Sequence, residues 1–79
     1  MKTQTLNEFT YNNLATTMVV RVTEYFERAD GAPDVFRVRV IYNDDDKLFT
    51  PATRSEAMRL GDEAVARFVQ ELNQIYWTD

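Results

Sequence analysis

The chain has 79 residues, which is enough for one domain spanning residues 1–79 and too few for two. It contains no cysteine and no histidine, so the commonest general base, the thiol nucleophile and the usual ligands of transition metals are missing. Thirteen acidic against nine basic residues give a net charge of −4, which repels nucleic acid and attracts basic surfaces. We therefore expect a domain that is not an enzyme and that holds no cofactor and no metal.

The N-terminal segment allows two interpretations. Thr5 and Glu8 have the spacing of a capping box, which would start a short helix. Alternatively, the segment is a strand that ends in a tight hairpin turn at Asn12 and Asn13. By parity, the strand would place four apolar side chains on one face: Phe9, Tyr11, Leu14 and Met18. The strand is the favoured interpretation.

Two segments alternate apolar and polar side chains, as strands with one buried face do: Leu14–Glu27 and Val35–Tyr42. They are predicted to form a hairpin with Phe26 opposite Phe36 and Val22 opposite Val40, because a slip of one residue would put arginines in the core. The inward residues are then Met18, Val20, Val22, Phe26, Phe36, Val38, Val40 and Tyr42, and Glu24 alone interrupts this face.

The next turn is predicted at residues 43–46, which are rich in aspartate. A short strand over residues 47–50 follows this turn, and Leu48 or Phe49 would add to the core. The sheet therefore has four strands if the N-terminal segment is a strand and three if it is a helix.

The last third of the chain is predicted to be one long amphipathic helix. Its apolar stripe consists of Met58, Val65, Phe68, Leu72 and Ile75, flanked by Ala57, Ala64, Val69 and Tyr76. Thr53 and Glu56 form a capping box at its start, and Thr50 is the alternative start. Gly61 lies on the stripe, where a glycine costs about 1 kcal/mol relative to alanine. Either the helix crosses closely over a strand at Gly61, or it breaks there and restarts at Asp62.

These elements predict an α+β fold, an antiparallel sheet of three or four strands packed on one long C-terminal amphipathic helix. The predicted order is β-β-β-β-α, with α-β-β-β-α as the alternative. On the outer face of the helix, four charged residues at intervals of four are expected to form ion pairs: Arg59, Glu63, Arg67 and Glu71.

Aspartates are concentrated in the two predicted loops that follow the central strands. Asp44, Asp45 and Asp46 lie in one loop, and Asp30 and Asp34 lie in the other. The first run lacks the glycine at position six and the glutamate at position twelve of an EF-hand loop, so it is not predicted to bind calcium. Carboxylates on projecting loops can instead imitate a phosphate backbone toward a basic protein. These five residues, together with Trp77, are the candidate protein-binding site.

The outer sheet face is a second candidate site. Three arginines and a tyrosine are predicted to share it: Arg21, Arg37, Arg39 and Tyr25. The expected register places Arg39 opposite Thr23 and Arg37 opposite Tyr25. Such a face can bind nucleic acid through phosphate contacts and stacking, or it can dock an acidic protein surface. The plain alternative is a solvated face on which these arginines pair across the strands with Glu27.

Trp77 crowds apolar area at the end of the helix together with Ile75 and Tyr76. Adjacent helical residues diverge by about 100°, so Trp77 is predicted to point away from the apolar stripe. It either folds back over the sheet edge or anchors a protein partner or a second copy. A homodimeric accessory subunit, joined through Trp77 or an edge strand, is therefore a further interpretation.

The order of strands followed by a helix is similar to a double-stranded-RNA-binding domain. The helix residues that carry the resemblance are Thr53, Arg54, Ser55, Glu56, Ala57, Met58, Ala64 and Leu72. That family places a cluster of lysines at the start of this helix, where they bind phosphates. Here the corresponding region offers only Arg54 and Arg59 beside several acidic residues, so the resemblance is one of topology.

In overall character, a short, acidic, cysteine-free α+β chain also resembles the small phage and mobile-element proteins that inhibit bacterial defence systems, anti-CRISPR proteins among them. This resemblance implies binding to a basic nucleic-acid-handling complex, whose contact with DNA or RNA is blocked. No export signal and no apolar run of about eighteen residues is present, so no membrane association is expected. The expected location is the cytoplasm of a bacterial host.

Overall fold

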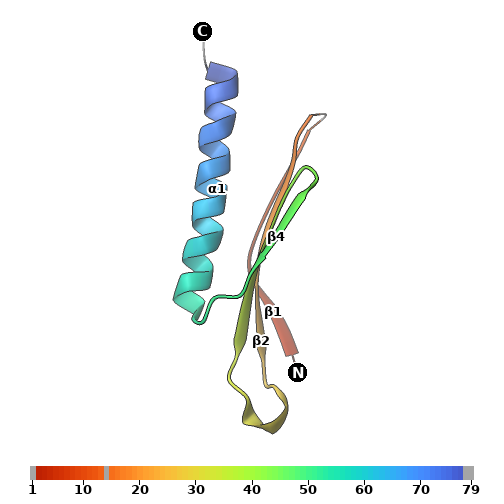
Figure 1. The fold of residues 1–79 in the computed structure, drawn as a ribbon, viewed down its shortest axis with the longest axis vertical. Helices are drawn as coiled ribbons and strands as arrows, with labels where there is room; N and C mark the ends of the chain where they lie inside the picture. The colour runs from red at the N-terminus through yellow and green to blue at the C-terminus, as the bar shows by residue number, and fades with distance from the viewer. Residues whose placement is uncertain (1, 14, 78–79) are drawn as a thin grey trace.

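The computed structural model describes residues 2–13 and 15–77, and for residues 73–77 it describes the backbone alone. The strands are β1 (Lys2–Asn12), β2 (Thr17–Phe26), β3 (Val35–Tyr42) and β4 (Asp45–Phe49), and they form one antiparallel sheet in the order β1-β2-β3-β4. A short 3-10 turn, η1 (Ala29–Gly31), lies between β2 and β3. The helix α1 (Arg54–Trp77) packs on one face of the sheet (Figure 1). The predicted α+β fold and its order β-β-β-β-α are confirmed.

The N-terminal segment is a strand, so the helical alternative is wrong. Phe9 lies opposite Val20 and Tyr11 opposite Met18, which confirms the predicted parity. The turn is longer than expected, because the Asn13 side-chain oxygen accepts hydrogen bonds from the N–H groups of residues 15 and 16 at 2.9 and 2.8 Å. The following strand starts at Thr17 instead of residue 14, and Leu14 itself lies outside the described residues.

The central hairpin has the predicted faces but not the predicted register. Val22 lies opposite Val38 and Phe36 opposite Glu24, which is a shift of two residues from the expected pairing. A shift of two preserves which side chains face inward, so the alternation of the sequence could not distinguish the two registers. The observed register is closed at one end by Asn43, whose backbone N–H donates to the carbonyl of Thr17 at 2.8 Å.

The strand predicted over residues 47–50 begins two residues early, at Asp45, and the turn before it consists of Asn43 and Asp44 alone. Neither Leu48 nor Phe49 joins the core, since they are 56% and 41% exposed. Leu48 lies on the outer face of the sheet, opposite Arg39. Phe49 lies on the helix side, but within the described residues α1 packs against β1, β2 and β3 and not against β4.

The helix starts as predicted, because the Thr53 hydroxyl accepts a hydrogen bond from the N–H of Glu56 at 3.1 Å. It runs without a break through Gly61, where an added Cβ would lie 2.7 Å from Cγ2 of Val22. The close crossing over a strand is thus confirmed. Val69, expected to flank the apolar stripe, is 42% exposed.

Within the described residues, no helix combines the length and the apolar character needed to cross a membrane.

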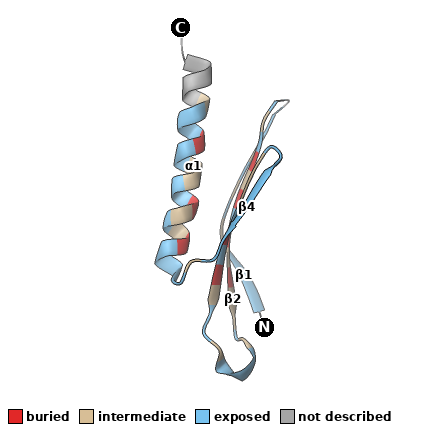
Figure 2. Cartoon of the chain, in the orientation of Figure 1, coloured by how far each residue is buried: buried red, intermediate tan, exposed pale blue. Residues whose placement is uncertain are grey.

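The core lies between α1 and the two central strands, as Figure 2 shows. Val22, Val38 and Ala57 are completely buried near the start of the helix. About three helical turns further along α1, Phe68 is surrounded by three aromatic rings in edge-on contact, with ring centroids at 6.2 Å for Phe9, 5.2 Å for Tyr11 and 5.7 Å for Tyr42. Phe68 therefore joins the helix to β1 and β3 at once.

The inward carboxylate predicted to interrupt the apolar face is buried, with Glu24 8% exposed. Its Oε1 accepts a hydrogen bond from Nη2 of Arg54 at 3.1 Å, at the first residue of α1. A buried carboxylate needs such a partner. Of the charge pairs predicted along the helix, Arg59 and Glu63 form one at 2.7 Å.

Candidate functional site

The outer sheet face, which the helix leaves open, brings together all four residues of the second candidate site. Arg21 and Arg39 lie directly opposite each other on β2 and β3, and Arg37 lies opposite Thr23. The expected pairings, Arg39 with Thr23 and Arg37 with Tyr25, are therefore wrong by the same two-residue shift. The four residues line one shallow hollow of about 610 Å³, together with Thr3, Thr5, Thr23, Asp46 and Leu48.

Two of these arginines are neutralised by acidic residues of the edge strands. Arg21 donates from Nε to Glu8 of β1 at 2.8 Å. Arg39 donates two hydrogen bonds to Asp46 of β4, at 3.1 and 2.6 Å. These bonds hold the pKa of Asp46 below its ordinary value and raise that of Arg39. A row of two carboxylates and two arginines, one from each strand, thus crosses the sheet, and its charges balance: Glu8, Arg21, Arg39 and Asp46.

Arg37 is bound differently from its two neighbours. Its guanidinium carbon lies 4.6 Å from the ring centroid of Tyr25, in a cation–π contact. Within the described residues, Arg37 forms no ion pair. It is therefore the one cation of the outer face whose charge is not compensated by a carboxylate among the described residues.

The candidate acidic residues do not form one surface. Asp44 is exposed in the turn between β3 and β4, whereas Asp45 and Asp46 belong to β4 and point to opposite faces of the sheet. Oδ2 of Asp45 lies 3.7 Å from Nζ of Lys47, and the carboxylate of Asp46 forms an ion pair with Arg39. The predicted loop of three free aspartates is thus wrong, because strand β4 begins inside it.

The other two candidate aspartates lie at the far end of the sheet. Asp30 is in η1 with a φ of 62°, and Asp34 precedes β3; both are exposed. The molecule is 57 Å long, and the loop between β2 and β3 lies at the opposite end of the sheet from the β3–β4 turn (Figure 1). The two sets of aspartates therefore cannot contact one small target together. The side chain of Trp77 lies outside the described residues.

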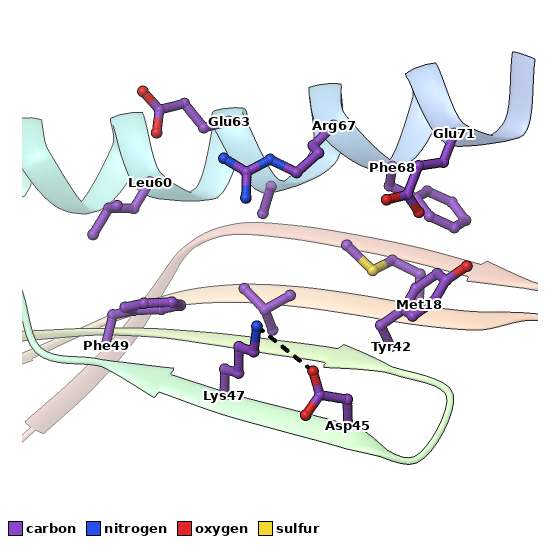
Figure 3. Close-up of a pocket in the computed structure, with 12 residues that line it drawn as sticks. Met18, Tyr42, Asp45, Lys47, Phe49, Leu60, Glu63, Arg67, Phe68 and Glu71 are labelled. Carbon is purple, nitrogen blue, oxygen red and sulfur yellow. Dashed lines mark ion pairs between the residues drawn. The ribbon is translucent and has the colours of Figure 1, made fainter. Parts of the chain in front are cut away.

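Sequence reasoning missed a groove on the helix side of the molecule. It has a volume of about 500 Å³ and runs between α1 and the β3–β4 hairpin (Figure 3). Its apolar lining consists of Met18, Val40, Tyr42, Phe49, Leu60, Ala64 and Phe68, and its charged lining consists of Asp45, Lys47, Glu63, Arg67 and Glu71. The sequence offers only a partial signal, the apolar Phe49 in the last strand, because the position of the helix across the sheet decides whether Phe49 is covered.

No group of three or more acidic, histidine or cysteine residues is arranged to hold a metal ion in the described part of the chain. Ser55, the only serine, is exposed in the first turn of α1. Comparison with protein-family models, with curated proteins and with solved structures found no match.

Proposed function

We propose that this chain is a non-enzymatic module that binds a basic protein surface through its acidic ends. The partner is a nucleic-acid-handling complex in the bacterial cytoplasm, and binding blocks its contact with DNA or RNA, in the manner of phage anti-CRISPR proteins. The observation that carries this proposal is the distribution of unpaired charge.

Most cations of the chain are already compensated. Six of the nine form ion pairs: Lys2, Arg21, Arg39, Lys47, Arg54 and Arg59. The acids without an ion pair in the described residues are Asp30, Asp34, Asp44, Asp62 and Glu71. Three of these five lie in the loops at the two ends of the sheet. A basic partner therefore meets negative charge at either end, and charge of one sign steers association.

The test is to purify partners on the tagged protein and then to compare charge-reversal variants. Asp44→Lys changes one end, and Asp30→Lys with Asp34→Lys changes the other. Asp62→Lys, an exposed unpaired acid in mid-helix, is the matched control. One end variant should weaken binding to the captured complex by about tenfold or more, since unpaired like charges at an interface cost several kcal/mol.

The same complex, given labelled DNA or RNA, reports the inhibition by fluorescence anisotropy. Wild-type protein should release the nucleic acid, the affected end variant should not, and Asp62→Lys should act as wild type. Equal binding by all variants would contradict the acidic-end mechanism.

A second function is favoured by one specific observation, the convergence of Arg21, Arg37, Arg39 and Tyr25 in one hollow. It is nucleic-acid binding by the outer sheet face. Titration of single- and double-stranded DNA and RNA at low salt tests it, with Arg37→Ala as the informative variant. This function requires binding that is salt-sensitive and that Arg37→Ala weakens. Affinity no tighter than the non-specific range excludes it.

A further inference from the structure

Strand β4 has a free edge beside the groove. It pairs with β3, and within the described residues no strand pairs with its other side. Such an edge is a template for one more strand, which a partner can supply as an extended peptide. The opposite edge, β1, is interrupted by a register shift between Thr5 and Asn7, and irregularities of this kind hinder pairing. No shift interrupts the pairing of β4.

The helix-facing side of β4 is left uncovered. Asp45, Lys47 and Phe49 lie opposite Tyr42, Val40 and Val38, whose side chains face the helix. Phe49 is nevertheless 41% exposed, because the helix stands over the neighbouring strands. An added strand would lie about 4.8 Å beyond β4, and its helix-facing side chains would close the open flank of the groove in Figure 3.

The order of these three side chains along β4 determines which peptide sequence fits beside it. Along β4 they read acidic, basic, apolar. Cross-strand neighbours stabilise a sheet when charges are opposite and when apolar groups meet. An antiparallel strand that matches β4 therefore reads, from its N-terminus, apolar-x-acidic-x-basic. The helix side of the groove carries Arg67 and Glu71, both without an ion pair within the described residues, so the preference for an acidic residue in the centre rests on Lys47.

A second copy of the chain does not satisfy this pattern. If the full length of β4 paired with itself, Lys47 would face Lys47 and Asp45 would face Phe49. Like charges directly opposite each other are destabilising, and lysine in the middle of an edge strand is a common protection against self-association. The occupant that fits is a segment of another protein.

We propose that β4 and the adjoining groove bind an extended peptide of a partner protein with the pattern apolar-x-acidic-x-basic, added antiparallel as a fifth strand. The proposal is independent of the acidic ends, so the two can fail separately. The probes are two synthetic nine-residue peptides of identical composition. One carries Val-Thr-Asp-Thr-Lys at its centre, and the other carries Val-Thr-Lys-Thr-Asp.

The first peptide should bind about tenfold more tightly than the second, because two cross-strand pairs change from opposite to like charge. In protein labelled with ¹⁵N, its binding should shift the amide resonances of β4 and of the groove. The double variant Asp45→Lys with Lys47→Asp should reverse the preference. The matched control, Lys2→Glu with Glu27→Lys, exchanges another ion pair and should leave the preference unchanged.

Three results would overturn the proposal. One is no detectable binding of the first peptide, and another is equal affinity for both peptides. The third is a molecular mass above 9.3 kDa in light scattering that falls back to the monomer value when Lys47 is changed to Asp, since a second copy would then occupy the edge.

Discussion

Gly61 lets α1 approach β2 more closely than a residue with a side chain would. The Cβ of an alanine at this position would lie 2.7 Å from a methyl group of Val22, which is completely buried. A mid-helix glycine normally costs about 1 kcal/mol of stability relative to alanine. The close contact with β2 explains why the helix keeps this glycine in its buried stripe.

We predict that Gly61→Ala destabilises the fold despite its better helix propensity. Overpacking of a filled core costs roughly 1–3 kcal/mol. Because the added Cβ would lie only 2.7 Å from Cγ2 of Val22, we expect a cost in the upper part of this range, above the gain of about 1 kcal/mol in propensity. Urea unfolding measures the difference. In a second variant, Val22→Ala together with Gly61→Ala should restore part of the loss relative to the sum of the single changes. Stabilisation by Gly61→Ala alone would show that the helix does not lie so close to the sheet.

Glu24 is the other residue whose environment departs from the pattern of its strand. Removing its partner with Arg54→Ala leaves a carboxylate in an apolar face, and we expect a loss of about 1–3 kcal/mol, the usual effect of an unsatisfied buried polar group. Arg59→Ala is the control, because Arg59 pairs with exposed acids and should lose at most about 0.5 kcal/mol. The two variants are compared by chemical denaturation. Equal losses would mean that the Glu24 carboxylate reaches water.

At the scale of the elements, alternation and helical periodicity were sufficient to identify the strands, their inward faces and the long helix. They could not fix the register of β2 and β3, because a slip of two residues leaves every face unchanged. The register depends on the turns at both ends of the hairpin. These turns contain three non-glycine residues with positive φ, Glu27, Asp30 and Asn43, and this conformation is uncommon at such residues and could not be predicted from the sequence.

The prediction of the candidate sites was limited by the same uncertainty about strand bounds and register. The outer arginine face was found because parity alone places Arg21, Arg37 and Arg39 together. The acidic loop was misjudged because β4 starts two residues early, which divides Asp45 and Asp46 between the two faces. The groove was missed because its existence depends on where the helix lies across the sheet, and that placement is a property of three-dimensional packing.

The β3–β4 turn depends on Asn43, which has a φ of 53° and accepts a hydrogen bond from the N–H of Thr17 at 2.9 Å. Asn43→Ala removes this bond and also strains the backbone, so we predict a loss of about 2 kcal/mol. Asn43→Gly should lose less, because glycine adopts positive φ freely. Thermal unfolding compares the two with Asp44→Ala as control. A glycine variant as unstable as the alanine variant would assign the whole effect to the hydrogen bond.

At the scale of the molecule, the charges of the outer face are balanced by a row that crosses all four strands. Glu8 and Asp46 stand on the two edge strands and hold Arg21 and Arg39 of the central strands, which face each other. Arginines directly opposite each other would repel if they were alone. The outer carboxylates therefore allow the sheet of a chain with net negative charge to carry adjacent arginines in its centre, and acids without an ion pair in the described residues lie in the loops at its ends.

This row of charges predicts how the stability of the fold depends on pH. The hydrogen bonds from Arg39 lower the pKa of Asp46 in the folded protein relative to its ordinary value of 3.8. The pair therefore contributes stability that is fully present above 3.8 and is lost as the pH falls from there through the lowered folded pKa. Asp46→Asn should lower stability at neutral pH and flatten the loss below 3.8, measured by urea unfolding across pH. Asp44→Asn, which alters an aspartate without an ion pair in the described residues, should keep the acid dependence of the wild type. If Asp46→Asn kept the same acid dependence as the wild type, the exposed Arg39–Asp46 pair would contribute nothing to folding, and Arg39 would be available to an anionic partner.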